Sequence, residues 1–123
     1  MHRSMRRTIA LVALALVTVM VVASLASAAT FRVRGKFTDN GYRWKPKTVE
    51  VPVQSRVVWK MVTGTHNVTS TSNNWSKSSG NIGSGGTTAH TFKKTGVFKY
   101  RCTLHSSVGS GKCTGMCGKV VVG

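Results

Sequence analysis

Acidic residues are almost absent from this chain. Its 123 residues include only Asp39 and Glu50 against 18 lysines and arginines, so the net charge is +16 with histidine neutral. Two carboxylates practically exclude acid–base catalysis by a carboxylate pair. A Ser/His/Asp set would have to use Asp39, which stands in the turn sequence Asp-Asn-Gly at 39–41. We therefore predict that the protein is not an enzyme.

Cysteine is also scarce, since the chain contains only Cys102, Cys113 and Cys117. An odd number leaves at least one thiol outside any intramolecular disulfide, and a metal ligand would explain the leftover. A nucleophilic Cys102 beside His105 is the remaining catalytic alternative. We disfavour it because it leaves a nearby methionine and an upstream histidine without a role.

Long apolar runs are confined to the first 28 residues. A basic start precedes an apolar run over 9–23, and small residues at Ala26 and Ala28 match the positions that a signal peptidase reads. We predict that residues 1–28 are a signal peptide and that the protein is exported, to the periplasm or to the cell surface and medium. The alternative is an uncleaved anchor, but the run is short for a span of about 20 residues.

The remaining residues, 29–123, should form a single small domain. Three of the 18 basic residues precede position 29, so 15 oppose two acidic residues and the net charge of this part is +13. Such a charge accelerates association with anionic partners. Acidic protein surfaces, anionic membranes and cell-wall polymers are the candidates. We expect a monomer and no specific nucleic-acid partner.

The predicted domain has the periodicity of strands. Apolar residues recur at every second position, as at Phe98, Tyr100 and Cys102, which should share one strand face. Turn sequences separate these runs, and 71–86 is expected to be a long surface loop. The pattern predicts an all-β fold, a Greek-key antiparallel β-sandwich of seven or eight strands. The strands are expected near 30–37, 42–44, 48–53, 56–62, 66–70, 87–93, 97–102 and 118–122.

Four residues with metal-binding side chains stand out in this pattern. Cys102 should end a strand, His105 should lie in the following turn and Met116 should close the next loop, so three donors come from one end of the sandwich. His66 stands alone upstream and must reach the same end from another strand. One thiolate, two imidazoles and one thioether are the donors of a blue-copper electron-transfer site.

The motifs around these residues resemble those of cupredoxins, especially the plastocyanin and amicyanin type. The resemblance covers nearly all of 29–123, including Thr-His-Asn-Val at 65–68, the run from Gly to His at 96–105, and Gly-Met at 115–116 before the final strand. It implies one copper ion held by His66, Cys102 and His105, with Met116 as a weak axial ligand. It also implies that Asn67 braces the loop beside Cys102.

The chain departs from this family pattern in the segment between His105 and Met116. Ten residues separate the two, more than is usual in plastocyanin-like loops, and Cys117 directly follows Met116. We predict a Cys113–Cys117 disulfide that closes the enlarged loop, with a stabilisation at or below the low end of about 2–4 kcal/mol. In the alternative, one of these two cysteines binds metal.

The resemblance implies a small exported type 1 copper protein that carries single electrons between redox partners and exchanges them at His105. The partners would present an acidic docking surface to the basic chain. The sequence leaves two alternative functions open. One is a copper carrier or buffer that uses the same ligands, and the other is a basic module that binds anionic polymers on a cupredoxin scaffold.

Overall fold

The computed structural model describes residues 17–18 and 29–123. The predicted signal peptide, 1–28, therefore falls almost entirely outside the described residues. Among those that are described, no helix is both long enough and apolar enough to cross a membrane.

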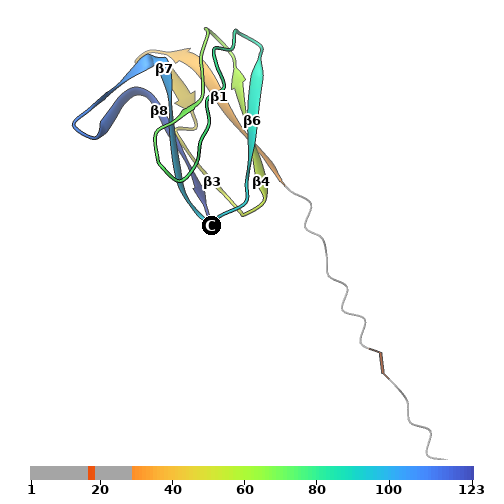
Figure 1. The fold of residues 1–123 in the computed structure, drawn as a ribbon. Coiled ribbons are helices and arrows are strands. Elements are labelled where there is room, and N and C mark those ends of the chain that lie inside the picture. The colour runs from red at the N-terminus through yellow and green to blue at the C-terminus, as the bar shows by residue number, and fades with distance from the viewer. Residues whose placement is uncertain (1–16, 19–28) are drawn as a thin grey trace, which may run out of the picture.

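The described chain folds into two packed four-stranded sheets (Figure 1). One sheet has the order β2-β1-β4-β6 and the other has the order β3-β8-β7-β5. The strands are β1 (Thr30–Thr38), β2 (Gly41–Lys45), β3 (Thr48–Val51), β4 (Ser55–Met61), β5 (Thr69–Ser70), β6 (Thr87–Phe92), β7 (Gly96–Gly109) and β8 (Lys112–Val122). The predicted β-sandwich of seven or eight strands is confirmed with eight strands, although its sheets are mixed and not purely antiparallel.

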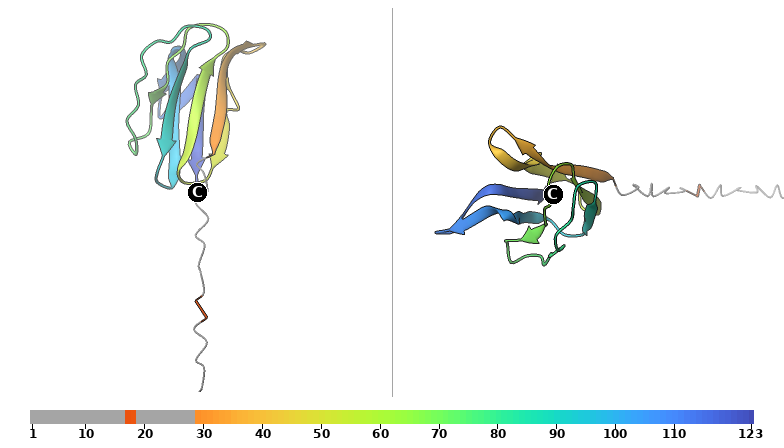
Figure 2. Two further views of the ribbon diagram at one scale, coloured as in Figure 1. Left: turned by 90° about the vertical axis from the view of Figure 1, so that its right-hand side faces the viewer. Right: turned by 90° about the horizontal axis from the view of Figure 1, so that it is seen from above.

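Each sheet combines antiparallel pairs with one parallel pair. β1 runs parallel to β4, and β3 runs parallel to β8. The parallel pairs arise because the chain crosses between the sheets after β2 and again after β3. β4 consequently returns beside β1 in the same direction, and the side view in Figure 2 shows β1, β4 and β6 next to one another.

The core consists of the inward-facing residues of both sheets. Tyr100 lies between Trp44 and Trp59, with ring-centre distances of 5.7 and 5.3 Å. All three are buried, together with Met61 and Phe92. Burial of an apolar side chain of this size contributes about 1.5–3 kcal/mol. The aromatic residues therefore supply much of the force that holds the sheets together.

β7 and β8 are much longer than the sequence pattern predicted. They form a hairpin that projects from the sandwich (Figure 1), with a two-residue turn at Ser110 and Gly111, both of positive φ. Such turns match the twist of paired strands. His105 and Met116 therefore lie within strands, whereas we had expected a turn and a loop.

The strand expected at 66–70 is reduced to β5, Thr69–Ser70. The segment before it leaves the sheet and pairs with the long connection instead, since the backbone of His66 exchanges hydrogen bonds of 3.0 and 2.7 Å with Ile82. The segment 71–86, predicted to be a loop, contributes no strand to either sheet. Its backbone nevertheless pairs with that of His66 through Ile82.

Candidate metal centre

Three donor atoms converge at the end of the sandwich opposite the C-terminus. His66 Nδ1 lies 3.2 Å from His105 Nδ1, and Cys102 Sγ lies 3.8 Å from the first nitrogen and 3.5 Å from the second. The centre of a triangle with these sides is about 2 Å from each corner, which matches the lengths of metal–imidazole and metal–thiolate bonds. The spacing fits one metal ion.

A wide bulge in the hairpin creates this convergence. Arg101 pairs with Cys117 and Ser106 pairs with Gly115, so the four residues 102–105 of β7 lie opposite Met116 alone. Extra residues bend the bulged strand and redirect its side chains. The bulge therefore turns both Cys102 and His105 toward one point and places Met116 on the facing strand.

Met116 is fully buried beside this point. A Cβ added to Gly35 of β1 would lie 3.0 Å from Met116 Cε, 3.1 Å from His66 Cδ2 and 2.9 Å from the Trp44 ring. The thioether side chain and the His66 ring consequently meet over the same glycine. Gly35 leaves the space that both of them occupy.

The backbone of Thr63 fixes the orientation of the His66 ring. Its Nε2 lies 2.6 Å from the carbonyl oxygen of Thr63, and His66 is fully buried. Because a carbonyl oxygen can only accept, Nε2 donates this hydrogen bond, and Nδ1 is the ring nitrogen that faces the other two donors. A hydrogen bond of this kind orients a metal-binding imidazole.

Asn67 joins the His66 segment to the bulge. Its Oδ1 accepts the backbone N–H of Thr103 at 3.0 Å and the Thr69 hydroxyl at 2.8 Å. Its Nδ2 donates to Thr103 Oγ1 at 2.8 Å and to Asn81 Oδ1 at 3.0 Å. These contacts place Asn67 beside the bulge that carries Cys102.

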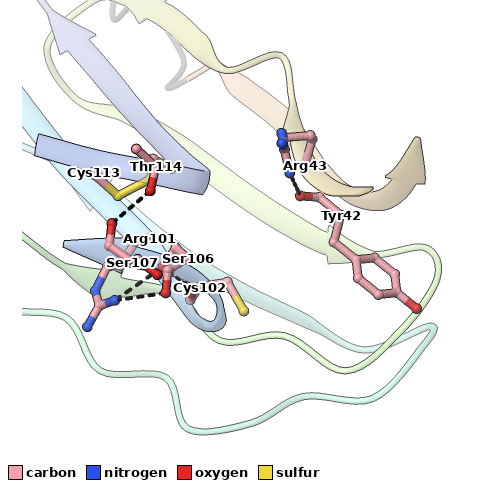
Figure 3. Close-up of a disulfide and its surroundings, with 9 residues drawn as sticks. Tyr42, Arg43, Arg101, Cys102, Ser106, Ser107, Cys113 and Thr114 are labelled. Atoms are coloured by element: carbon pink, nitrogen blue, oxygen red, sulfur yellow. Dashed lines mark hydrogen bonds between the residues drawn. A yellow bond between two sulfur atoms is a disulfide. The ribbon is translucent and has the colours of Figure 1, made fainter. Parts of the chain in front are cut away.

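Two further side chains close the bulge from the hairpin side. The Ser106 hydroxyl donates to the carbonyl oxygen of Cys102, and Arg101 Nη1 donates to Ser106 Oγ at 3.2 Å (Figure 3). The sequence carried no signal for this pair, because both are common polar residues. Together they connect the two ends of the segment that bears the thiol.

Cys113 and Cys117 form a disulfide, and Cys102 is the free, buried cysteine. The Cα atoms of the disulfide are 6.2 Å apart, whereas four residues of extended strand span about 13 Å. β8 is therefore coiled between them, around Gly115 and Met116. Because the two sulfurs are bonded to each other, neither Cys113 nor Cys117 can be a metal ligand in this structure. The alternative in which one of these two cysteines binds metal is therefore contradicted.

The ring of Tyr42, on β2, covers the imidazoles of His66 and His105. The sequence pattern did not indicate this contact. The ring centre of Tyr42 lies 4.4 Å from that of His105 and 5.0 Å from that of His66. Gly64 makes room for it, because a Cβ there would lie 2.8 Å from the tyrosine ring. Burial and the nearby His66 lower the pKa of His105, which keeps its nitrogen free to bind a metal.

The other histidine of the sandwich lies apart from this cluster. His90 is on β6, where its ring packs against Trp75 and Phe92 at 5.4 and 4.7 Å. The cluster itself offers one thiol, two imidazoles and a neighbouring thioether. Soft sulfur donors together with imidazoles suit copper better than they suit magnesium or calcium.

Comparisons with known proteins support the fold. No family model and no curated protein matches the chain. Similar solved structures include a purple cupredoxin from Nitrosopumilus maritimus, which is 24% identical with a TM-score of 0.56; the match covers 77% of this chain and 99% of that one. A reduced mutant of amicyanin is 22% identical with a TM-score of 0.61, over 82% and 88% of the two chains.

The same fold also occurs within a larger protein. A copper-containing nitrite reductase from Thermus scotoductus is 21% identical with a TM-score of 0.57, and the match covers 78% of this chain but 22% of that one. At these identities the likeness establishes the fold alone. This chain has the cupredoxin fold, as its sequence motifs predicted.

Proposed function

We propose that this protein binds one copper ion through His66, Cys102 and His105, with Met116 as the axial ligand, and carries single electrons between redox partners. The observation that carries the proposal is the triangle of donor atoms, with sides of 3.2, 3.5 and 3.8 Å, beside a buried thioether. Copper in such a site supplies a one-electron couple between Cu(II) and Cu(I).

The burial of the donors supports electron transfer. Cys102, His66 and Met116 are fully buried, whereas His105 is partly exposed. The His66 ring donates to the carbonyl oxygen of Thr63, and Asn67 accepts the backbone N–H of Thr103, next to Cys102, so the fold itself holds these two donors in place. Little rearrangement is therefore needed when the charge changes, and His105 is the ligand through which a partner exchanges an electron.

The charge of the chain supports a partner with an acidic docking surface. The protein is proposed to act as an exported monomer, with 1–28 removed as a signal peptide. Association with an acidic partner should slow as ionic strength rises, because salt screens exposed charges beyond about 8–10 Å. Stopped-flow electron transfer at several salt concentrations measures this dependence.

The direct test is to add Cu(II) to the purified protein and record its absorption and electron-spin-resonance spectra. We expect the intense red-region absorption of a copper–thiolate bond and its loss in Cys102→Ser. His90→Gln is the matched control, because His90 lies outside the cluster, and it should retain the colour. A colourless copper complex of the unaltered protein would contradict the proposal.

A copper carrier with the same ligands is distinguished by its behaviour with a chelator. The buried donors favour retention, so the copper should remain bound through repeated cycles of reduction and oxidation in the presence of a moderate chelator. Ready release in either oxidation state would instead support a carrier.

A further inference from the structure

The outer surface of the sheet β2-β1-β4 is covered with positive charge. We name it the basic face. Six of its seven cationic residues are exposed and Arg43 is partly exposed. The seven residues are Arg32, Arg34, Lys36, Arg43, Lys45, Arg56 and Lys60.

The strand register places these charges against one another. Arg34 of β1 lies directly opposite Lys45 of β2 on one side and Lys60 of β4 on the other, so three cations form a row across three strands. Lys36 lies opposite Arg43 in the next row. Like charges in directly opposed positions destabilise a sheet. The fold therefore keeps an arrangement that its own stability disfavours.

No acidic residue compensates this surface within the described chain. Asp39 lies in the turn between β1 and β2, and Glu50 lies on β3 of the other sheet. The basic face therefore presents a positive potential to solvent, and an external anion is needed to neutralise it.

The basic face extends in two dimensions, along and across three neighbouring strands. Neighbouring strands are about 4.8 Å apart, and side chains on one face of a strand repeat about every 6.7 Å. The outward positions of the adjoining β6 are small, at Thr87, Ala89 and Thr91. A depression of about 410 Å³ on the basic face is lined by Arg32, Arg34, Lys36, Lys60 and Val62.

We propose that the basic face docks the protein on a bilayer of acidic phospholipids. A plane of negative headgroups can meet both rows of cations at once, whereas a linear polyanion can follow only one. A specific protein interface would need an apolar anchor in its centre. Val62, at the end of the depression, is the one large apolar side chain exposed there. Attraction of lysine and arginine to anionic lipid needs no such anchor.

Docking in this way leaves the metal centre free. The strands would lie along the membrane. The donor cluster, at one end of the sandwich and outside the basic face, would remain open to a partner. The proposal does not depend on copper, because the cations belong to the sheet and not to the donor cluster. Binding to lipid should therefore be the same with and without copper.

The experiment titrates purified protein with phosphatidylcholine vesicles that contain or lack phosphatidylglycerol, at low and at physiological salt. The test variant is Arg34→Gln/Lys45→Gln/Lys60→Gln, which removes the central row. We expect tight, salt-sensitive binding to the acidic vesicles only, and about 100-fold weaker binding by the test variant. The variant should melt no lower than the unaltered protein, because repulsion within the row is removed.

The matched control is Lys99→Gln/Lys112→Gln/Lys119→Gln, which lowers the net charge equally at exposed positions of the other sheet. It should bind acidic vesicles within about threefold of the unaltered protein, because its cations belong to β7 and β8 and not to the basic face. Equal losses in both variants would overturn the proposal, since net charge alone would then explain binding.

Two other outcomes would also overturn it. Equal binding to neutral vesicles would show that the attraction does not depend on negative headgroups. Binding to polyphosphate or DNA, with none to acidic vesicles, would make the basic face a site for linear polyanions. A copper-loaded protein that shows no thiolate absorption would contradict the proposed function and would leave the vesicle result unaffected.

Discussion

The ring of Tyr42 packs against the ring of His105, with centres 4.4 Å apart and planes inclined by 42°. The two residues are more than 60 positions apart in the chain, and they meet because the start of β2 faces the bulge of β7. Tyr42 also touches the ring of His66 at 5.0 Å. One side chain therefore limits the movement of both imidazoles and their access to water.

Removal of the Tyr42 ring should loosen metal binding. We expect Tyr42→Ala to release copper to a chelator about 10-fold faster, because groups that orient metal ligands contribute about 10–100-fold to metal affinity. Tyr42→Phe keeps the ring and should behave like the unaltered protein. Stopped-flow loss of the thiolate absorption measures the rates. Equal rates for alanine and phenylalanine would contradict the role of the ring.

Loss of the Asn67 amide should destabilise the fold as well as the site. Asn67→Ala leaves the backbone N–H of Thr103 without its partner and removes three other hydrogen bonds. A typical hydrogen bond contributes about 0.5–1.5 kcal/mol. Since the four that are lost are partly buried, we expect a loss of about 1–3 kcal/mol in urea unfolding. The control is Asn73→Ala at an exposed position, which should change the unfolding free energy by less than about 0.5 kcal/mol.

A single methyl group at Gly35 should disturb the centre. In Gly35→Ala the new Cβ would approach Trp44, Met116 and His66 at 2.9, 3.0 and 3.1 Å. We expect a destabilisation of about 1–3 kcal/mol from overpacking and a changed spectrum of the copper-loaded protein. Gly83→Ala is the matched control, because a Cβ there meets nothing within 4 Å. An unchanged spectrum in Gly35→Ala would show that the ligands do not rest on this glycine.

His90 should make the fold less stable in mild acid. Burial, and secondarily the charge of Lys77, lower the pKa of His90 below its ordinary value of 6.5. The unfolded chain then binds this proton more readily than the folded protein. His90 therefore costs no stability above about pH 6.5, and it costs progressively more as the pH falls from there to its folded pKa.

Urea unfolding at pH 7 and at pH 5 tests this sign. His90→Gln should lose less stability than the unaltered protein between the two pH values. Lys77→Gln should keep the direction of the effect and reduce its size, because burial is the larger cause. An equal loss in His90→Gln and in the unaltered protein would show that His90 does not contribute.

Strands with regular alternation were predictable within one or two residues. The expected ranges 30–37, 56–62 and 87–93 correspond to β1, β4 and β6. The strand expected over 66–70 is shorter in the structure, because His66 pairs with Ile82 outside the sheet. The hairpin beyond Cys102 was missed because its serines and glycines lack alternation. These outer parts of β7 and β8 form because each supplies the hydrogen-bonding partner of the other.

The sequence by itself determined the donor types, the alternating core and the excess of basic residues, because composition and a two-residue period are local properties. Only the tertiary structure decided that residues 102–105 face Met116 alone, that Tyr42 covers both imidazoles and that Arg34 lies between Lys45 and Lys60. Each of these depends on the register between strands that are distant in sequence. Register is set by how the two sheets fill their common core, and a shift of one residue would turn every side chain of a strand to the other face.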